Sequence, residues 1–172
     1  MTKERLYCAC AYNVHDSSVS FAINNKVVLI LEAERIFKQK KKRCDQREME
    51  KLISIGLEYL GKKSKDVNGW AMTTLNNPLL IRDDIIDKNT TNPKEPYYKE
   101  VTILGLQTQA LIINHHLSHA ATYLLSQFDQ AIITTCDGGG DHEPKIGVGE
   151  CFAVYRGENN NITRHYDRYP KF

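Results

Sequence analysis

The sequence predicts an α/β fold with a mixed sheet and helices, and three observations support this. Three short apolar segments, 6–12, 18–23 and 26–34, are separated only by turn-forming residues, as expected for adjacent antiparallel strands. A helical spacing of apolar residues follows over 45–60, and further strand-like segments come after it. The resulting order, β-β-β-α-β-α-β-β-β, favours a mixed sheet with helices over a doubly wound parallel sheet.

The first three predicted strands form a meander. Cys8 and Cys10 alternate within the first strand, so both face the same side of the sheet as small hydrophobic side chains. Asn24-Asn25 fits a two-residue hairpin turn, because asparagine tolerates positive φ. The third strand has an unbroken apolar run over 27–31, which is typical of a strand that is buried on both faces.

The middle of the chain contains one clear helix and one long polar segment. The helix over 45–60 ends at Gly61, and a buried strand is expected over 69–74. The segment 76–99 is polar and contains three prolines, so we expect most of it to be a long loop or an insertion.

The last third of the chain is predicted as a helix over 117–128, a strand over 130–136 and a hairpin of 150–156 with 162–166. The apolar residues of the helix should form its packing face. They are Ala120, Ala121, Leu124 and Leu125.

Composition excludes several classes of function. At 172 residues and a net charge of +2, the chain is the size of one domain and has no excess charge suited to binding nucleic acid. It has no stretch of about 20 apolar residues, so we expect no membrane association. The five cysteines include no Cys-x-x-Cys pair, which favours a reduced, cytoplasmic protein. The basic run over 38–43 is either a solvated turn or a phosphate-binding segment.

A pair of histidines and a glycine run carry most of the chemical information. His115 and His119 are four residues apart, so on a helix they point from one face and can share a metal ion. Asp137 ends a strand and precedes Gly138-Gly139-Gly140, whose backbone N–H groups can approach phosphate oxygens. Together they indicate a metal held next to a phosphate, as in nucleotide-dependent chemistry.

Simpler interpretations of these residues stay open at this point. The histidines could bond to the backbone at a helix start, and the glycines could form an ordinary tight turn. His116 points to another face of the helix, where it could support a ligand or contact a substrate. Asp141 is a second possible metal ligand, but Asp137 has the better position after the strand.

Four motifs, taken in order, resemble those of the ATP-dependent O-carbamoyltransferases, which include nodulation and antibiotic-tailoring enzymes. They are Val-His-Asp-Ser-Ser at 14–18, Glu-Ala-Glu-Arg at 32–35, Asn-His-His-Leu-Ser-His-Ala at 114–120 and Asp-Gly-Gly-Gly at 137–140. More distantly, the pattern is similar to the hydrogenase-maturation carbamoyltransferase and the tRNA threonylcarbamoyladenosine enzymes. The resemblance implies one half of an actin-like, sugar-kinase-like (ribonuclease H-like) ATPase fold.

The resemblance also implies a two-step reaction and its cofactors. Carbamoyl phosphate would supply carbamate, ATP would convert it to carbamoyladenylate, and a hydroxyl of a small-molecule acceptor would receive the carbamoyl group. The implied metal ligands are His115, His119 and Asp137, and the ion could be iron, zinc, manganese or magnesium. Gly138, Gly139 and Gly140 would cradle phosphate.

Two further residues are implied at the catalytic site. His15 resembles the residue at the carbamoyl phosphate site, where it would act as an acid–base group or bind the phosphate. Lys40 lies where the family has a phosphate-binding lysine after Glu-Arg. The family pattern there usually ends in Lys-His, whereas Lys41 follows Lys40 here, so the register of this lysine is open by one residue.

The resemblance implies that residues 1–172 form the N-terminal lobe of a carbamoyltransferase catalytic domain. The second half would supply much of the adenosine pocket, a further metal carboxylate and the acceptor site, in cis or in trans. We therefore expect this chain to be inactive alone. The alternative is a non-catalytic metal- or nucleotide-binding subunit that works with a separate second half. A sugar kinase is disfavoured, because phosphoryl transfer to a sugar has no evident use for the histidine pair.

Overall fold

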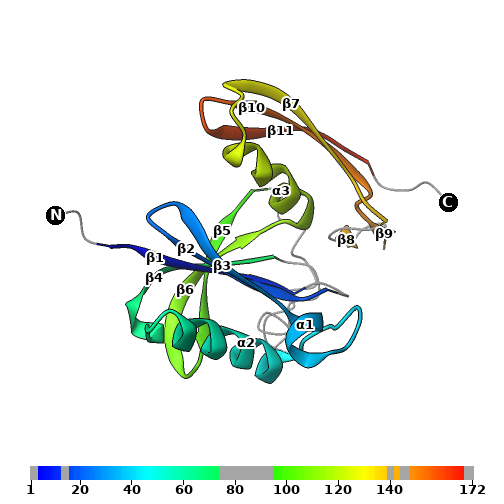
Figure 1. The fold of residues 1–172 in the computed structure, drawn as a ribbon. Coiled ribbons are helices and arrows are strands. Elements are labelled where there is room, and N and C mark those ends of the chain that lie inside the picture. Colours follow the sequence, from blue (N-terminus) through cyan, green and yellow to red (C-terminus); the bar gives the residue numbers. More distant parts are fainter. Residues whose placement is uncertain (1–3, 13–15, 74–94, 139–141, 144–147, 169–172) are drawn as a thin grey trace. The chain divides into compact units, whose positions relative to one another are not determined.

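The computed structural model describes residues 4–12, 16–73, 95–138, 142–143 and 148–168. The chain divides into two compact units, one formed by 1–86 with 97–112 and the other by 87–96 with 113–172. We call them unit 1 and unit 2 and describe each by itself. By these ranges, unit 1 carries the N-terminal motifs, and unit 2 carries the histidine pair and Asp137. Figure 1 shows the helices and strands of the chain.

Unit 1 is a six-stranded mixed sheet with the order β3-β2-β1-β4-β6-β5. Strands β1, β2 and β3 pair as an antiparallel meander, β4 lies parallel to β1, and β5 and β6 form an antiparallel hairpin. The strands are β1 (Leu6–Ala11), β2 (Ser18–Ile23), β3 (Lys26–Glu32), β4 (Val67–Thr73), β5 (Tyr97–Ile103) and β6 (Leu106–Ile113). The helices are α1 (Ala33–Phe37), α2 (Gln46–Tyr59) and the short 3₁₀ turn η1 (Ser64–Asp66).

Helix α2 begins where its sequence supplies a complete capping box. The Asp45 carboxylate accepts from the backbone N–H of Glu48 at 2.8 Å, and the Glu48 carboxylate accepts from that of Asp45 at 3.1 Å. The helix buries one face against the sheet, where the Phe21 ring lies so close to Gly56 that a Cβ there would be 2.1 Å from the ring. Met49, Leu52, Ile53 and Leu57 complete the helix side of this core.

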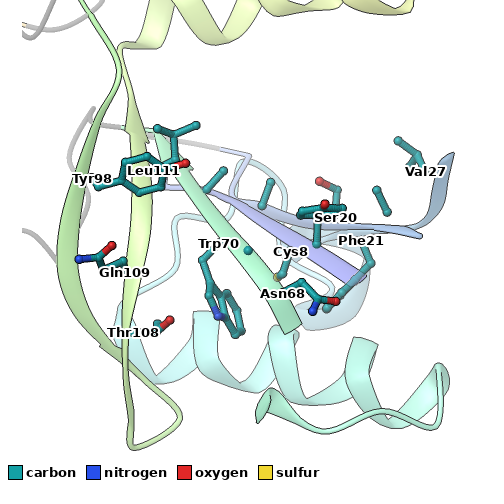
Figure 2. Close-up of a pocket in the computed structure, with 15 residues that line it drawn as sticks. Cys8, Ser20, Phe21, Val27, Asn68, Trp70, Tyr98, Thr108, Gln109 and Leu111 are labelled. Carbon is teal, nitrogen blue, oxygen red and sulfur yellow. The ribbon is translucent and has the colours of Figure 1, made fainter. Parts of the chain in front are cut away.

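The other face of the unit 1 sheet is hollowed into a cavity of about 500 Å³. Small residues of the central strands form its floor, among them Ala9, Ala22 and Gly69. Figure 2 shows Tyr98 and Leu111 at one side of the cavity, while Trp70 points toward α2.

Unit 2 is smaller and has an antiparallel sheet with the order β11-β10-β7. Its elements are α3 (His115–Ala120), η2 (Ala121–Leu125), β7 (Gln130–Cys136), β8 (His142–Glu143), β9 (Val148–Gly149), β10 (Phe152–Glu158) and β11 (Asn161–Arg168). Ala120, Ala153 and Tyr155 form its buried apolar core. Because this apolar core is small, buried polar side chains make up a large part of the interior of unit 2.

The structure confirms the predicted mixed α/β class, the meander, the helix at 45–60 and the shared face of Cys8 and Cys10, both of which are buried. The prediction that the third strand is buried on both faces is wrong. Val28 and Ile30 are 41% and 61% exposed, because β3 is the edge strand and one of its faces is open. Its last predicted residues form the start of α1 instead.

Two other predictions need correction. Residues 97–99 of the expected loop are the start of β5, and the β5–β6 hairpin was not predicted; the segment 76–94 lies outside the described residues. The helix expected over 117–128 begins at His115 and becomes a 3₁₀ turn at Ala121. Of its predicted packing face, Ala120 is buried, but Leu125 is 75% exposed. Among the described residues, no helix has the length and apolar character needed to span a membrane.

Burial makes the cysteines differ in reactivity. Cys44 is buried, and burial, followed by the nearby Glu48 carboxylate, raises the pKa of its thiol to about 11. At pH 8 such a thiol is ionised to roughly one part in a thousand, and only the thiolate reacts with alkylating reagents. Burial also raises the pKa of the Cys8 thiol. We expect iodoacetamide to modify the exposed Cys136 in the folded chain and to leave Cys8 and Cys44 unmodified, as measured by peptide mass spectrometry. Equal labelling of Cys44 and Cys136 before unfolding would contradict this.

Candidate metal centre

The local sequence at the start of α3 fixes the two histidines on one face. The side-chain oxygen of Asn114 accepts from the backbone N–H of Leu117 at 3.0 Å, and its backbone carbonyl accepts from that of Ser118 at 2.8 Å. This cap starts the helix at His115. His115 and His119 then lie one turn apart, with ring centroids 4.7 Å from each other and ring planes perpendicular.

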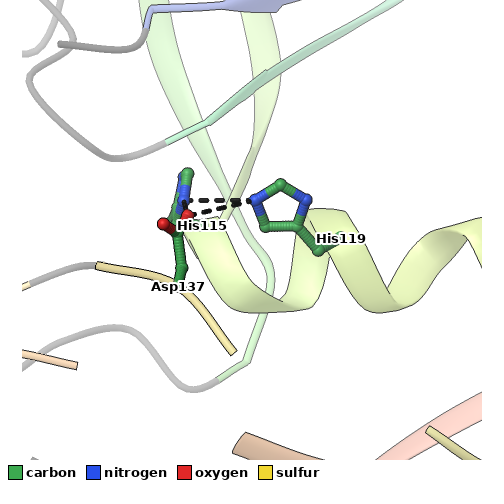
Figure 3. A group of neighbouring side chains, drawn as sticks. All are labelled: His115, His119 and Asp137. Carbon is green, nitrogen blue, oxygen red and sulfur yellow. Dashed lines mark hydrogen bonds and ion pairs between the residues drawn. The ribbon is translucent and has the colours of Figure 1, made fainter. Parts of the chain in front are cut away.

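Asp137 reaches the histidines from the end of β7. Its backbone N–H donates to the carbonyl of Cys151 at 3.1 Å, and its Oδ1 accepts from the backbone N–H of Gly138 at 2.6 Å. The Asp137 Oδ2 atom lies 2.8 Å from His115 Nε2 and 3.6 Å from His119 Nε2. Figure 3 shows the three side chains converging, with the two Nε2 atoms 3.2 Å apart.

The three donor atoms have the spacing of a metal's ligand shell. For ligands about 2.1 Å from an ion, neighbouring donor atoms are roughly 3.0 Å apart at octahedral angles and roughly 3.4 Å at tetrahedral angles. The observed separations of 2.8, 3.2 and 3.6 Å bracket these values. Two imidazoles and one carboxylate suit iron, zinc or manganese. The residues present therefore fit a metal ion, which would replace the hydrogen bonds between them.

The electrostatics of the group favour the metal-binding forms of its members. The hydrogen bond from His115 lowers the pKa of the Asp137 carboxyl, and the backbone N–H of Gly138 acts in the same direction. Burial lowers the pKa of His119, and the neighbouring His115 lowers it further. At neutral pH, Asp137 is thus ionised and His119 is neutral, as ligation requires.

The other predicted site residues are placed as follows. Gly138 is adjacent to Asp137 and exposed, whereas His15, Gly139, Gly140 and Asp141 lie outside the described residues. Lys40 is exposed in the turn after α1, within unit 1.

The basic run over 38–43 is used partly for structure. Lys42 forms an ion pair with Glu48 at 2.6 Å, next to the N-terminus of α2. Lys38 and Lys41 both have positive φ, at 54° and 53°, so this segment is a tight, irregular turn. It leaves the ammonium group of Lys40 open to solvent.

His116 was expected on another face of the helix, and its contacts confirm this. It is fully buried, and its ring bonds to Thr135 and to the backbone of Glu150. Sequence reasoning missed Glu150 and Arg164, a buried ion pair in the same unit. Little in the sequence points to this pair. Glu150 is a single charged residue at the edge of a strand-like segment, and Arg164 is a single charged residue within another.

Comparison with known sequences found a relative that is similar to this chain. No protein-family model matches the chain. The chain is 27% identical over 142 residues to the nodulation protein NolNO of Sinorhizobium fredii (strain NBRC 101917 / NGR234). The predicted resemblance to the nodulation carbamoyltransferases is confirmed. The aligned region covers 74% of this chain and 20% of NolNO, so the chain spans about a fifth of that relative's length.

A solved structure also aligns with the chain. It is the Aquifex aeolicus member of the Ppx/GppA protein family, which matches at a TM-score of 0.45 and 9% sequence identity. The alignment covers 98% of this chain and 51% of that one.

Proposed function

We propose that residues 1–172 form the N-terminal lobe of an ATP-dependent O-carbamoyltransferase, and that His115, His119 and Asp137 bind its metal ion. The observation that carries this proposal is the convergence of the three donor atoms, which all lie within 4.8 Å of one another. The match to NolNO supports a carbamoyltransferase-like role for the chain.

In the proposed reaction, water first hydrolyses carbamoyl phosphate to carbamate and inorganic phosphate. An oxygen of carbamate attacks the α-phosphorus of ATP, and the bond to pyrophosphate breaks. The carbamoyl group then passes from carbamoyladenylate to a hydroxyl of a small-molecule acceptor, and AMP is released. The bound metal would neutralise phosphate charge, which is the main requirement for catalysis at a nucleotide.

Residues of this chain have separate roles in the proposal. His15 binds the phosphate of carbamoyl phosphate or exchanges a proton with it, and Lys40 supplies positive charge. The backbone N–H groups of Gly138, Gly139 and Gly140 hold phosphate oxygens of ATP beside the metal. A second half, in cis or in trans, completes the adenosine and acceptor sites.

The free cysteines of the described chain support a cytoplasmic location.

Binding of carbamoyl phosphate to this chain tests the proposal. We expect the phosphorus NMR signal of carbamoyl phosphate to broaden on addition of the chain and Mg²⁺, and no AMP to form from added ATP. His15→Ala and Lys40→Ala should each remove the broadening, because each deletes a contact to phosphate. Lys65→Ala, which removes an exposed lysine on η1, is the matched control and should leave it unchanged.

Two results would count against the proposal. Absence of broadening with the unmodified chain would show that the chain does not bind carbamoyl phosphate. Broadening that survives both substitutions would show that His15 and Lys40 do not contact its phosphate. Formation of AMP and pyrophosphate only when both substrates are present would support the reaction, but it would contradict the expectation that this chain is inactive alone.

A further inference from the structure

A group of buried polar side chains lies behind the metal ligands in unit 2. Asn114, His116 and Glu150 are each 0% exposed, and Thr135 is 7% exposed. Burying so many polar groups is unfavourable unless each one is hydrogen-bonded. Their bonds form two connections from α3, which carries both histidines. One goes to Thr135 of β7, the strand that ends before Asp137, and the other goes to Glu150, whose neighbour Cys151 accepts a hydrogen bond from the Asp137 backbone.

The first connection runs through His116. Its Nε2 lies 3.0 Å from the carbonyl oxygen of Glu150, which can only accept, so Nε2 carries a hydrogen. Its Nδ1 lies 2.8 Å from the hydroxyl oxygen of Thr135, within hydrogen-bond distance. Thr135 lies on β7, two residues before Asp137. His116 therefore ties the helix of His115 to the strand of Asp137.

The second connection runs through Asn114. Its side-chain oxygen caps α3, while its side-chain nitrogen donates to Glu150 Oε2 at 3.4 Å. Because one amide makes both bonds, the direction of the cap depends on the position of Glu150. Glu150 is in turn held by an ion pair with Arg164 of β11, whose guanidinium lies over the Tyr155 ring.

Stability alone does not account for this ion pair. The desolvation of two buried charges commonly offsets their attraction, and apolar replacements are often as stable or more stable. A buried pair does impose a single orientation on the groups around it. Here the group that it orients is Asn114, which begins the helix at His115.

We infer that Asn114, His116, Thr135 and Glu150 are positioning residues that set the separation of the metal ligands. This inference rests on the proposed function for its purpose, but the positioning itself concerns the chain alone. It predicts that cutting either connection moves the His115 and His119 rings relative to Asp137. Supporting groups of this kind typically change metal affinity by about 10- to 100-fold.

Two conservative variants cut the connections separately. Thr135→Val removes the hydroxyl that meets His116 and keeps the side-chain shape. Asn114→Ser keeps a good helix cap but cannot reach Glu150. Thr163→Val makes the same isosteric change at an exposed site on β11, and Ile162→Ala weakens the core of unit 2 without touching the network.

The first readout is the ring-nitrogen NMR spectrum of the metal-free chain. We expect the His115 and His119 ring signals to shift in Thr135→Val and Asn114→Ser and to stay in place in both controls. The second is a Co²⁺ titration followed by visible absorption, in which affinity should fall about tenfold in the two network variants only.

The two readouts separate the two hypotheses. Unshifted ring signals in Thr135→Val and Asn114→Ser would overturn the positioning role, and so would an equal shift in Ile162→Ala. If the unmodified chain does not bind Co²⁺ but the ring signals shift as expected, the proposed metal binding is refuted and the positioning role is supported.

Discussion

Replacing His119 with alanine is expected to weaken Co²⁺ binding by at least about a hundredfold and to leave the chain folded. Loss of a group that only supports a ligand costs about 10- to 100-fold in affinity, so loss of a ligand itself should cost more. The His119 side chain is 54% exposed, so its removal sacrifices little packing. Calorimetric titration of Co²⁺ measures the affinity, and circular dichroism measures the fold.

The same experiment has a matched control in unit 2. His165 is an exposed histidine on β11, and His165→Ala should leave Co²⁺ affinity within about twofold of the unmodified chain. Asp137→Asn should resemble His119→Ala, because a neutral amide is a much poorer ligand than a carboxylate. Equal affinities for His119→Ala and His165→Ala would show that the ion binds elsewhere.

The grouping of His115, His119 and Asp137 could be predicted in part, because some of its signals are local. The four-residue spacing of His115 and His119 fixes a shared face on any helix, and Asp137 follows a recognisable strand. Their meeting depends on α3 packing against β7, which no spacing reveals. The expectation that they meet comes from the resemblance of the ordered motifs to the carbamoyltransferases, and the structure places the three side chains together.

Other features could not be predicted because they depend on distant contacts. Asp45 and Glu48 predict the start of α2 from within one helical turn. The residues next to β3 do not indicate that it is an edge strand with an exposed face. Glu150 and Arg164 are 14 residues apart and meet only after β10 and β11 form. A charged residue within a strand-like segment usually faces solvent, so sequence reasoning passed over both.

Replacing Arg164 with methionine is expected to lower the free energy of unfolding of unit 2 by about 3–5 kcal/mol. The substitution keeps much of the side-chain volume but removes the cation from beside a fully buried carboxylate. Hydrogen exchange at the β10 amides measures the effect, because β10 lies at the centre of the sheet of unit 2. The single tryptophan, Trp70, belongs to unit 1 and reports separately on that unit.

Two further variants show whether the loss comes from buried charge. Arg156→Met removes a half-exposed arginine that pairs with Glu158 at 2.9 Å, and it should cost no more than about 1 kcal/mol. Adding Glu150→Gln to Arg164→Met should recover much of the lost stability, because the buried group is then neutral. Equal losses for Arg164→Met and Arg156→Met, without recovery in the double variant, would mean that the Glu150 carboxylate is solvated. The Glu150–Arg164 pair would then not orient Asn114, and His116 alone would position the proposed metal ligands.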